Sequence, residues 1–467
     1  MNLMFVDRKE ELTFLQERYK KKGFEFFVIY GRRRIGKTEL IKQFITKNPH
    51  LYFLCDKSGT ERNMHRFKRK IAEYLNEPPI ETNHLEDLFA YLAKKTQNTR
   101  LILVFDEFSY LVEKDTTVPS QFQLIVDEIL KKTNIFLILC GSSISRMEKG
   151  VLSAKSALYG RKTAHIKVDS LPFTSFQEFY PTNTLEKNIE FYATLGAVPF
   201  YLEKFTDKKT TFDNIREQLF NKKGKLYEEI DFLLKEELRE PDTYKTILSA
   251  LAAGHNKVVE IANTAGIKVH DIDKYLKTLL RLGIIQKEIP IDTVKSKKTT
   301  YTIKDNFFSF SFLFSEPQKS NLEIGETLSA EETLQKKFPS YVGRRFESLI
   351  RDELLKKLQV FTAQKTGKWW GHYRDRKTNT RKEVEIDIVA LNTSSQQILF
   401  GECKWKNNVD GTSILRDLKG KTQYFEWLRT HQNWEKHYLV VAKSFQKKTP
   451  ERNVSYIDLA EIQKKIQ

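Results

Sequence analysis

A glycine-rich segment at residues 31–38 has the residue types and spacing of a phosphate-binding loop. Its two glycines permit a tight turn in which backbone N–H groups converge on phosphate oxygens. The Lys that follows the second glycine can neutralise β- and γ-phosphates, and the next residue, a Thr, can ligate Mg²⁺. The segment therefore predicts a site for ATP and Mg²⁺ made by Gly31, Arg32, Arg33, Arg34, Ile35, Gly36, Lys37 and Thr38.

An acidic pair, Asp106 and Glu107, ends the apolar run 101–107. At the end of a buried strand, Asp106 would hold Mg²⁺ through water, and Glu107 would orient or deprotonate the water that attacks the γ-phosphate. Such a pair alone is often only the solvated start of a loop. Because it follows a phosphate-binding loop, it favours nucleotide hydrolysis.

A second group of acidic residues occurs in the last third of the chain. Glu347 falls on an apolar-periodic helix, Asp387 in the strand-like segment EVEIDIVAL, and Glu402 two residues before Lys404 in the next such segment. Strand alternation puts Glu402 and Lys404 on one face. Ionised carboxylates among apolar neighbours need a cation, and Mg²⁺ or Mn²⁺ is the simplest. Alternatively, the acidic residues form a solvated face and Glu402 and Lys404 an exposed ion pair.

The elements that would position these residues define an α/β fold. Four apolar strands alternate with helices in the first 150 residues, which predicts a parallel sheet covered on both faces. Three short helices and two strands at 243–316 have the order of a winged helix. The expected organisation is a P-loop core at 1–180, a helical lid region at 181–242, the winged helix at 243–316, a linker at 317–339 and a separate α/β domain at 340–467.

With these motifs in place, the first two thirds of the chain resembles the archaeal-type ATPase family of the STAND/AAA+ group. The resemblance rests on the GRRRIGKT loop, the acidic pair and three shorter features at 141–143, 157–161 and 196–199. It implies that Ser142, or Ser143 beside it, senses the γ-phosphate, and that Pro199 contacts the base region. It also implies that Arg161 approaches the phosphates, from the same subunit or from a neighbour in a homo-oligomer. The alternative for Arg161 is a structural salt bridge, and for the three consecutive arginines simple solvent exposure.

The pattern of a helical Glu followed by D-x14-E-x-K resembles the PD-(D/E)XK nuclease superfamily over residues 340–467. The resemblance implies that Asp387 and Glu402 hold Mg²⁺ with help from Glu347, and that Lys404 positions or activates the attacking water. It also matches Gln423 to a supporting Gln of some relatives. The proline of the motif is missing before Asp387, and some members of this superfamily only bind DNA.

Cationic and aromatic residues near this second site would suit a phosphate backbone. They are Lys365, Lys368, Trp369, Trp370, Arg374, Arg376, Lys377 and Lys406. The two Trp residues could equally belong to the core. A recognition helix of the winged helix would add Lys268, His270, Lys274, Lys277 and Arg281, and its wing tip Lys295, Lys297 and Lys298. The alternative is that the winged helix is a packing module.

The formal charge of the chain is +18, and residues 331–467 hold 27 Lys and Arg against 17 Asp and Glu. This balance suggests a polyanionic partner, nucleic acid first and DNA more than RNA, although a Lys-rich surface can merely keep a protein soluble. The longest uncharged run is too short and polar to cross a membrane. The N-terminus is not a secretory signal, and three distant cysteines do not form a disulfide framework, so a cytoplasmic location is expected.

These observations give one hypothesis and its alternative. The first is an ATP-binding and ATP-hydrolysing protein whose nucleotide state gates a metal-dependent, nuclease-like, DNA-binding C-terminal domain. The alternative is a nucleotide-regulated switch, or a winged-helix DNA-binding regulator, without nuclease activity.

Overall fold

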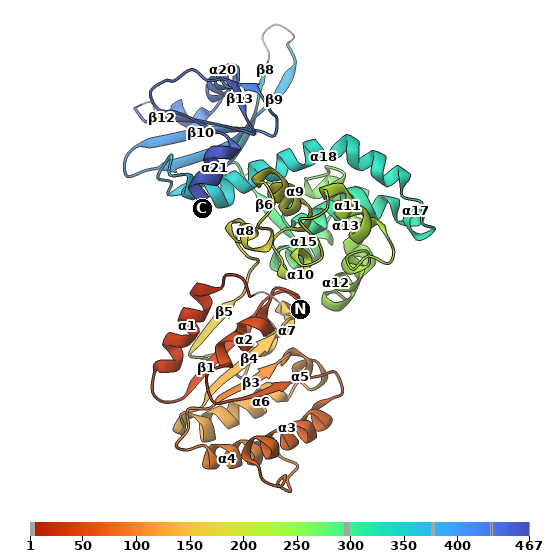
Figure 1. The fold of residues 1–467 in the computed structure, drawn as a ribbon, viewed down its shortest axis with the longest axis vertical. Helices are drawn as coiled ribbons and strands as arrows, with labels where there is room; N and C mark the ends of the chain where they lie inside the picture. Colours follow the sequence, from red (N-terminus) through yellow and green to blue (C-terminus); the bar gives the residue numbers. More distant parts are fainter. Residues whose placement is uncertain (1–4, 294–298, 375–378, 430, 432, 467) are drawn as a thin grey trace. The chain divides into compact units, whose positions relative to one another are not determined.

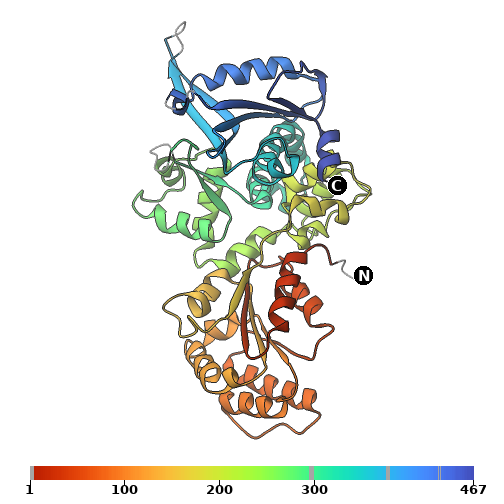
Figure 2. The ribbon, with the colours of Figure 1, turned by 90° about the vertical axis from the view of Figure 1, so that its left-hand side faces the viewer.

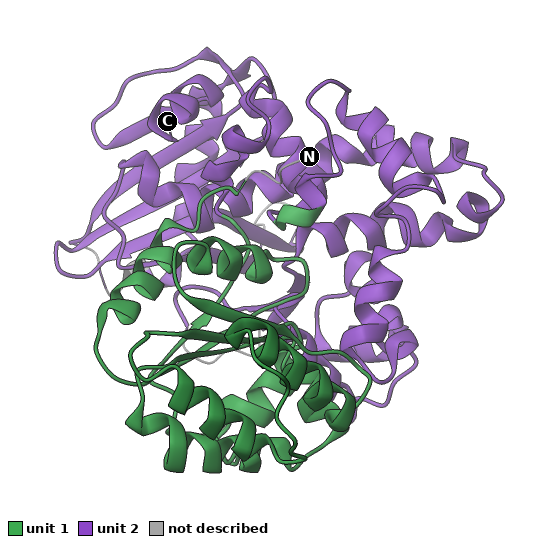
Figure 3. Cartoon of the chain, turned by 60° about the horizontal axis from the view of Figure 1, so that its bottom comes forward, with its two compact units in different colours: residues 1–171, 198–200 green, residues 172–197, 201–467 purple. Residues whose placement is uncertain are grey.

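The structure is a computed structural model of the 467-residue chain, described here for residues 5–293, 299–374, 379–429, 431 and 433–466. The chain divides into two compact units, which Figure 3 shows in green and purple. Unit 1 comprises Met1–Leu171 with Val198–Phe200, and unit 2 comprises Pro172–Ala197 with Tyr201–Gln467.

Unit 1 is built on a parallel five-stranded sheet in the order β2-β3-β4-β1-β5 (Figure 1). The strands are β1 (Glu25–Tyr30), β2 (His50–Leu54), β3 (Ile102–Asp106), β4 (Phe136–Gly141) and β5 (Ala164–Lys167). All four neighbouring pairs run parallel, which confirms the predicted parallel sheet. Since parallel strands share one carboxyl edge, the segments after β1, β3 and β4 meet there.

Helices cover both faces of this sheet. On one face, Phe67 of α3 (Thr60–Leu75) and Phe89 of α4 (Leu85–Lys95) pack against Phe105 of β3. On the other, Phe44 of α2 (Lys37–Ile45) packs against Phe136 of β4. The remaining helices of unit 1 are α1 (Lys9–Lys20), α5 (Ser109–Lys114), α6 (Val118–Leu124) and α7 (Ile144–Met147), with the π-helical segments η1 (Ile125–Ile129) and η3 (Glu148–Leu152).

The first part of unit 2 is helical, and three helices and a hairpin follow in the predicted order. The hairpin strands β6 (Ile285–Glu288) and β7 (Thr300–Ile303) pair antiparallel. The assignment of this segment as a winged helix stays a prediction. The helices are α8 (Phe176–Phe179), α9 (Leu185–Leu195), α10 (Pro199–Leu202), α11 (Thr211–Ile215), α12 (Glu229–Glu237), α13 (Pro241–Ala252), α14 (Val258–Thr264) and α15 (Ile272–Arg281).

The segment 317–339, expected to be a linker or a loose helix, is largely helical in the structure. This segment contains α17 (Lys319–Glu323) and most of the 22-residue helix α18 (Leu328–Leu349). Ala330, Leu334 and Phe338 of α18 are buried at a spacing of four residues, so one stripe of the helix packs against the core. The polar residues between them gave the segment the composition of a linker and hid this period.

The C-terminal part of unit 2 forms a separate five-stranded sheet in the order β14-β12-β10-β9-β8. Strands β8 (Lys365–Arg374), β9 (Arg381–Asn392) and β10 (Gln397–Lys404) form an antiparallel meander, and β12 (Glu435–Ala442) and β14 (Val454–Ile457) continue it in parallel. The chain passes from β10 to β12 through α20 (Gly411–Thr422), which lies along one face of the sheet (Figure 2).

Short elements complete this part of the chain. They are α16 (Asn306–Phe310), α19 (Leu355–Leu358), β11 (Val409–Asp410), β13 (Phe445–Lys447) and α21 (Leu459–Ile466). None of the helices in the described residues combines the length and the apolar character needed to cross a lipid bilayer.

Candidate functional site

The phosphate-binding loop lies between β1 and α2, at the carboxyl edge of the unit 1 sheet. Gly36 has a φ of 91° and Arg34 a φ of 66°, so the loop turns through the left-handed region twice before α2 begins. Lys37 is only 6% exposed. Its Nζ donates to the carbonyl oxygens of Gly31 at 2.9 Å and Arg32 at 2.7 Å. The lysine thus lies across the inside of its own loop, where phosphate oxygens would replace these carbonyls.

Asp106 is the meeting point of three elements. Thr38 Oγ1 donates to its Oδ2 at 2.8 Å, as the predicted Mg²⁺ site requires. The hydroxyl of Tyr52, on β2, donates to the same oxygen at 2.6 Å. Burial and the neighbouring Asp106 carboxylate raise the pKa of Tyr52 well above its usual value, so the tyrosine stays a hydrogen-bond donor. The sequence analysis missed Tyr52, because one tyrosine in a buried strand matches no motif.

Glu107 is held by the neighbouring strand end. Its backbone has a φ of 55°, and Ser142 Oγ donates to its Oε2 at 2.7 Å. The structure therefore places the Ser142 hydroxyl on Glu107, the predicted general base. Contact of Ser142 with the γ-phosphate stays a prediction.

A buried arginine supports the loop from behind. Arg8 Nη2 donates to the carbonyl oxygens of Ile35 at 3.0 Å and Asp169 at 2.6 Å, and its Nη1 pairs with Glu11 at 2.9 Å. Sequence reasoning missed Arg8 as well. Its only signal was a charged residue at the start of an amphipathic helix, where charges are usual.

The other predicted nucleotide residues are distributed around the loop. Pro199 lies beside Gly36, with its Cγ 3.8 Å from where a Cβ on that glycine would be. The guanidinium of Arg34 lies 4.0 Å from the ring centre of Phe200, and Arg33 donates to the Tyr110 hydroxyl at 2.9 Å.

Arg161 forms an ion pair with Asp127 of η1 at 2.8 Å. In this structure it therefore makes the salt bridge that the sequence analysis offered as the structural alternative. Its approach to the nucleotide remains a prediction.

The second predicted site lies on β9 and β10. Asp387 and Glu402 are 7% and 5% exposed. They stand one position beyond the last ladder pair, Ile388 with Gly401, so they are opposite each other on neighbouring strands. Asp387 Oδ2 accepts a hydrogen bond from the backbone N–H of Cys403 at 2.9 Å.

Burial, together with mutual repulsion, raises the pKa values of two of these acids. Burial, followed by the charge of Glu402, raises the pKa of Asp387 to about 6. Burial, followed by the charge of Asp387, raises the pKa of Glu347 on α18 to about 7. Carboxyls that resist ionisation in this way are the donor set that a divalent cation would stabilise.

Lysines already neutralise one of the acids. Glu402 accepts hydrogen bonds from Lys404 at 2.8 Å and, on both oxygens, from Lys421 of α20 at 2.7 and 2.8 Å. Burial lowers the pKa of Lys404, but the Glu402 carboxylate outweighs it and raises the pKa overall. Gln423, two residues past Lys421, is exposed beyond the end of α20. The helix therefore brings a lysine, not the matched glutamine, to the acids.

Asp387 and Glu402 are of a type that binds divalent cations, but they are not yet arranged as a metal site. Among the described residues, no group of three His, Cys, Asp or Glu is arranged to hold a metal ion. Asp387 and Glu402 supply hard oxygen donors at one place, and Glu402 would have to exchange lysine contacts for the cation.

Several residues of the expected cationic surround have structural partners. Trp369 and Trp370 are both buried, and Trp369 Nε1 donates to Asp292 at 3.0 Å, so both belong to the core. Lys368 pairs with Glu385, and Lys365 Nζ donates to the carbonyl oxygen of Ile291 at 2.6 Å. The residues outside the described ones are Lys295, Lys297, Lys298, Arg376 and Lys377.

Comparisons with known proteins match two parts of the chain to families. Residues 5–205 match the model of an ATPase domain predominantly from Archaea. Residues 310–414 match a family of archaeal and bacterial proteins of unknown function. An uncharacterised protein of Methanocaldococcus jannaschii, MJECL04, is 38% identical over 454 residues, which cover 95% of this chain and 97% of that protein.

Another M. jannaschii protein, described as the uncharacterised ATP-binding protein MJ0423, is 51% identical over 43 residues, which cover 9% of this chain and 73% of that protein. Among solved structures, the Walker-type ATPase PABY2304 of Pyrococcus abyssi aligns with a TM-score of 0.48 and 18% identity, covering 66% of this chain and 96% of that one. The ORC2 protein of Aeropyrum pernix aligns with a TM-score of 0.42 and 13% identity, covering 69% and 97%.

Proposed function

The chain belongs to the same family as its M. jannaschii relative MJECL04 and carries an ATPase domain of the archaeal type, and from this premise we propose that its nucleotide state gates a metal-dependent nuclease site in the C-terminal sheet. The N-terminal domain is an ATPase domain. The observation that supports the nuclease site is the opposed pair Asp387 and Glu402 on β9 and β10, with the Lys404 ammonium on Glu402.

In the ATPase site, each side chain has a distinct task. Lys37 would move from the carbonyls of its own loop onto the β- and γ-phosphates. Thr38 would turn its hydroxyl from Asp106 toward Mg²⁺, which, when bound, neutralises charge on the phosphate oxygens. Glu107 would leave Ser142 and accept the proton of the attacking water. Its contact with Ser142 therefore describes a resting arrangement.

In the C-terminal site, Asp387 and Glu402 would hold the cation with Glu347 as a third acid. A divalent ion there supplies polarisation of the phosphodiester and a lowered water pKa. The Lys404 ammonium would then be freed from Glu402 to orient the water and to stabilise charge on the scissile phosphate. Lys421 would keep Glu402 neutralised until the cation arrives.

The order of elements supports the same proposal. A helix, three antiparallel strands, a helix and a parallel strand follow one another as α18, β8, β9, β10, α20 and β12. This order sets the acids on β9 and β10, two neighbouring strands in the interior of the sheet. The substrate we propose is nucleic acid, because the C-terminal region carries a net positive charge, and DNA is the first candidate.

A cleavage assay on the full chain tests the proposal. Duplex DNA, single-stranded DNA and RNA are incubated with Mg²⁺ or Mn²⁺, with and without ATP. We expect cleavage that depends on the metal and responds to ATP. Asp387→Ala and Lys404→Ala should each lose activity by about 100-fold or more, the scale of a positioned proton-transfer group. Glu383→Ala, an exposed acid on the same strand, is the matched control and should cleave like wild type.

Two further variants separate the two sites. Lys37→Ala should abolish ATP binding, and Glu107→Gln should retain binding and stop hydrolysis. Both should leave the metal-dependent site intact while removing its response to the ATP cycle. If no nucleic acid is cut under any condition, or if Asp387→Ala cuts as well as wild type, the nuclease proposal is wrong.

The occupation of Glu402 by two lysines favours a second candidate, a nucleotide-regulated switch whose C-terminal sheet docks DNA without cutting it. This candidate predicts DNA binding that EDTA does not change, and no cleavage. Removal of Lys421 then distinguishes the two. A switch should bind DNA less well in Lys421→Ala, whereas a nuclease should show an altered metal requirement.

A further inference from the structure

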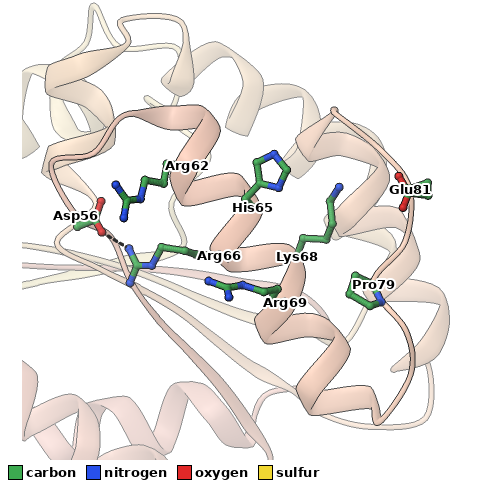
Figure 4. Close-up of a pocket in the computed structure, with 8 residues that line it drawn as sticks. All are labelled: Asp56, Arg62, His65, Arg66, Lys68, Arg69, Pro79 and Glu81. Atoms are coloured by element: carbon green, nitrogen blue, oxygen red, sulfur yellow. Dashed lines mark hydrogen bonds and ion pairs between the residues drawn. The ribbon is translucent and has the colours of Figure 1, made fainter.

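Helix α3 in unit 1 lines a hollow of about 670 Å³, which we call the α3 hollow (Figure 4). Five of the residues that line it follow one another on this helix: Arg62, His65, Arg66, Lys68 and Arg69. Pro79 and Glu81, from the segment after the helix, form its other wall, and Asp56 lies at the end nearest β2. None of these residues takes part in the two sites described above.

The cationic face results from the helical period. Arg62, Arg66 and Arg69 recur at intervals of four and three residues, so they share one side of α3. Phe67 and Ile71 occupy the opposite side and are buried in the core of unit 1. The helix is fixed by its apolar face and by Arg66, which lies over the Phe53 ring and donates to the carbonyl oxygen of Leu54, whereas Arg62 and Arg69 are exposed.

These charges are largely uncompensated. In the part of the chain that the structure describes, Arg66 forms an ion pair with Asp56, while Arg62, Lys68 and Arg69 form none. Arg62, His65 and Arg69 are exposed. Like charges held together on one rigid face repel one another, and an anionic ligand removes that cost.

The spread of the charges indicates the kind of anion. Seven residues separate Arg62 from Arg69, which places their Cα atoms about 10 Å apart along the helix. A cationic stripe of this length matches an extended polyanion, and the phosphates of a nucleic acid strand recur along its length at about 3.4 Å per residue. Four of the lining residues are Arg or Lys, the side chains that most often contact phosphates, so we expect contacts mainly to the backbone.

The two acids in the hollow argue against an acidic protein segment. Asp56 and Glu81 would repel a run of carboxylates, which offers no donors in return. A nucleic acid carries donors beside its phosphates, in base amino groups and in the 2′-hydroxyls of RNA, from which a carboxylate can accept hydrogen bonds. We propose that the α3 hollow binds the sugar–phosphate backbone of a nucleic acid strand, independently of sequence, so that the ATPase unit has a nucleic-acid site of its own.

The test is fluorescence anisotropy with the full chain in EDTA, which prevents cleavage. The probes are fluorescein-labelled 30-nucleotide single-stranded DNA, RNA and duplex DNA, titrated over a range of NaCl concentrations. Wild type is compared with Arg62→Ala/Arg69→Ala. The matched control is Lys20→Ala/Lys94→Ala, which removes two exposed charges of unit 1 outside the hollow. Thermal melts establish that both variants fold like wild type.

We expect the arginine variant to bind each probe about tenfold more weakly at physiological salt. The slope of log K against log salt should become less steep by about 1.4–1.8 units, because two phosphate contacts are lost. The lysine control should retain the wild-type slope. An arginine variant that matches the control overturns the proposal. So does tighter binding of a labelled polyglutamate of equal charge that depends on the same arginines, because the hollow would then be a protein-docking site.

The experiment does not depend on the C-terminal proposal. If Asp387→Ala binds nucleic acid but does not cleave it, the binding measured for the arginine variant still tests the α3 hollow. If the arginine variant binds like wild type, the cleavage assay still tests the C-terminal site. The two proposals therefore fail separately.

Discussion

At the scale of single residues, each carboxylate of the acidic pair is held by a hydroxyl from a neighbouring strand. Tyr52 donates to Asp106 and Ser142 donates to Glu107. Hydrogen bonds to charged groups contribute about 1.5–3 kcal/mol each, so these contacts are strong enough to fix the acids when no nucleotide is bound. Asp106 and Glu107 are therefore positioned before a ligand binds, and Tyr52 helps to position Asp106.

We therefore predict that Tyr52→Phe impairs the Mg²⁺ step. The ring stays in the core but Asp106 loses one of its donors, and loss of such an outer contact costs about 10-fold in metal affinity or activity. The Mg²⁺ concentration for half-maximal ATP hydrolysis should rise by that factor, while ATP binding without metal stays near wild type. Tyr19→Phe is the control, since its hydroxyl donates to the carbonyl of Arg100, away from the acids. An unchanged Mg²⁺ requirement in Tyr52→Phe would contradict this role.

Residues that belong to a local motif could be predicted from the sequence, whereas residues that meet only through the fold could not. Lys37, Thr38 and Asp106 were predictable because the backbone of a phosphate loop and a strand end imposes fixed spacing on them. Tyr52 and Lys421 reach their acids by side-chain geometry across strands and helices that are distant in sequence. Nothing in their local pattern marks them, so only the folded chain identifies them.

At the scale of elements, the loop between β1 and α2 depends on its close approach to the end of β5. Gly31 has a φ of 156°, and a Cβ there would overlap the carbonyl oxygen of Val168. A backbone atom cannot move aside as a flexible side chain can. The glycine is therefore required both by conformation and by space.

Gly31→Ala should destabilise unit 1 by about 2 kcal/mol or more and abolish ATP binding, because the loop must shift to admit the methyl group. Chemical denaturation and nucleotide titration measure the two effects. Gly420→Ala in α20 is the matched control. That glycine is exposed and has open space around its Cβ position, so the change should stabilise its helix by about 0.5–1 kcal/mol. Normal ATP binding by Gly31→Ala would refute the steric account.

A second element-scale prediction concerns pH. Glu353, in the π-helical segment η8 (Ile350–Leu354) after α18, accepts hydrogen bonds from the Tyr192 hydroxyl and the Phe173 N–H. Burial raises the pKa of Glu353 above its ordinary 4.5. The folded state then binds this proton more tightly than the unfolded state. Its contribution to stability is present below the unfolded pKa and is lost as the pH rises toward the folded pKa.

The melting temperature of wild type relative to Glu353→Gln should therefore fall as the pH rises from about 4.5 toward neutrality. The amide cannot ionise. Its oxygen can accept from the Phe173 N–H, and its NH₂ group can donate to the Tyr192 hydroxyl oxygen. All other carboxyls are common to the two proteins, so the difference isolates this one. A difference in melting temperature that is constant across this range would show that Glu353 ionises as it does in the unfolded chain.

Elements were predictable to different degrees for similar reasons. The strands of unit 1 were recognisable as short, wholly apolar runs, because both of their faces are covered. Helix α18 was harder to predict from the sequence. Along its first half only one residue in four is buried, and the residues between are polar, as they would be in a linker. Such a narrow apolar stripe changes the composition of a segment little, although it is enough to fix the helix against the core.

At the scale of the whole molecule, the gating proposal requires that nucleotide bound in unit 1 changes unit 2. We predict that ATP with Mg²⁺, held without turnover by Glu107→Gln, slows amide hydrogen exchange in the phosphate loop and also alters exchange in β9 and β10. Lys37→Ala with the same nucleotide should show neither change. Exchange differences confined to unit 1 would mean that the two units respond independently, and gating would be excluded.

Strand β2 has a consequence for how ligands of unit 1 influence one another. Tyr52, within the strand, contacts Asp106, and Asp56, two residues beyond its end, pairs with Arg66 of the α3 hollow. A ligand that draws Arg66 away from Asp56 changes the restraints on the segment that contains Tyr52, and Tyr52 holds the Asp106 carboxylate. Thermodynamic linkage makes such an effect reciprocal: the factor by which nucleic acid changes the affinity for ATP and Mg²⁺ is the factor by which they change the affinity for nucleic acid. Each turnover would then alternately tighten and loosen the hold of unit 1 on a strand.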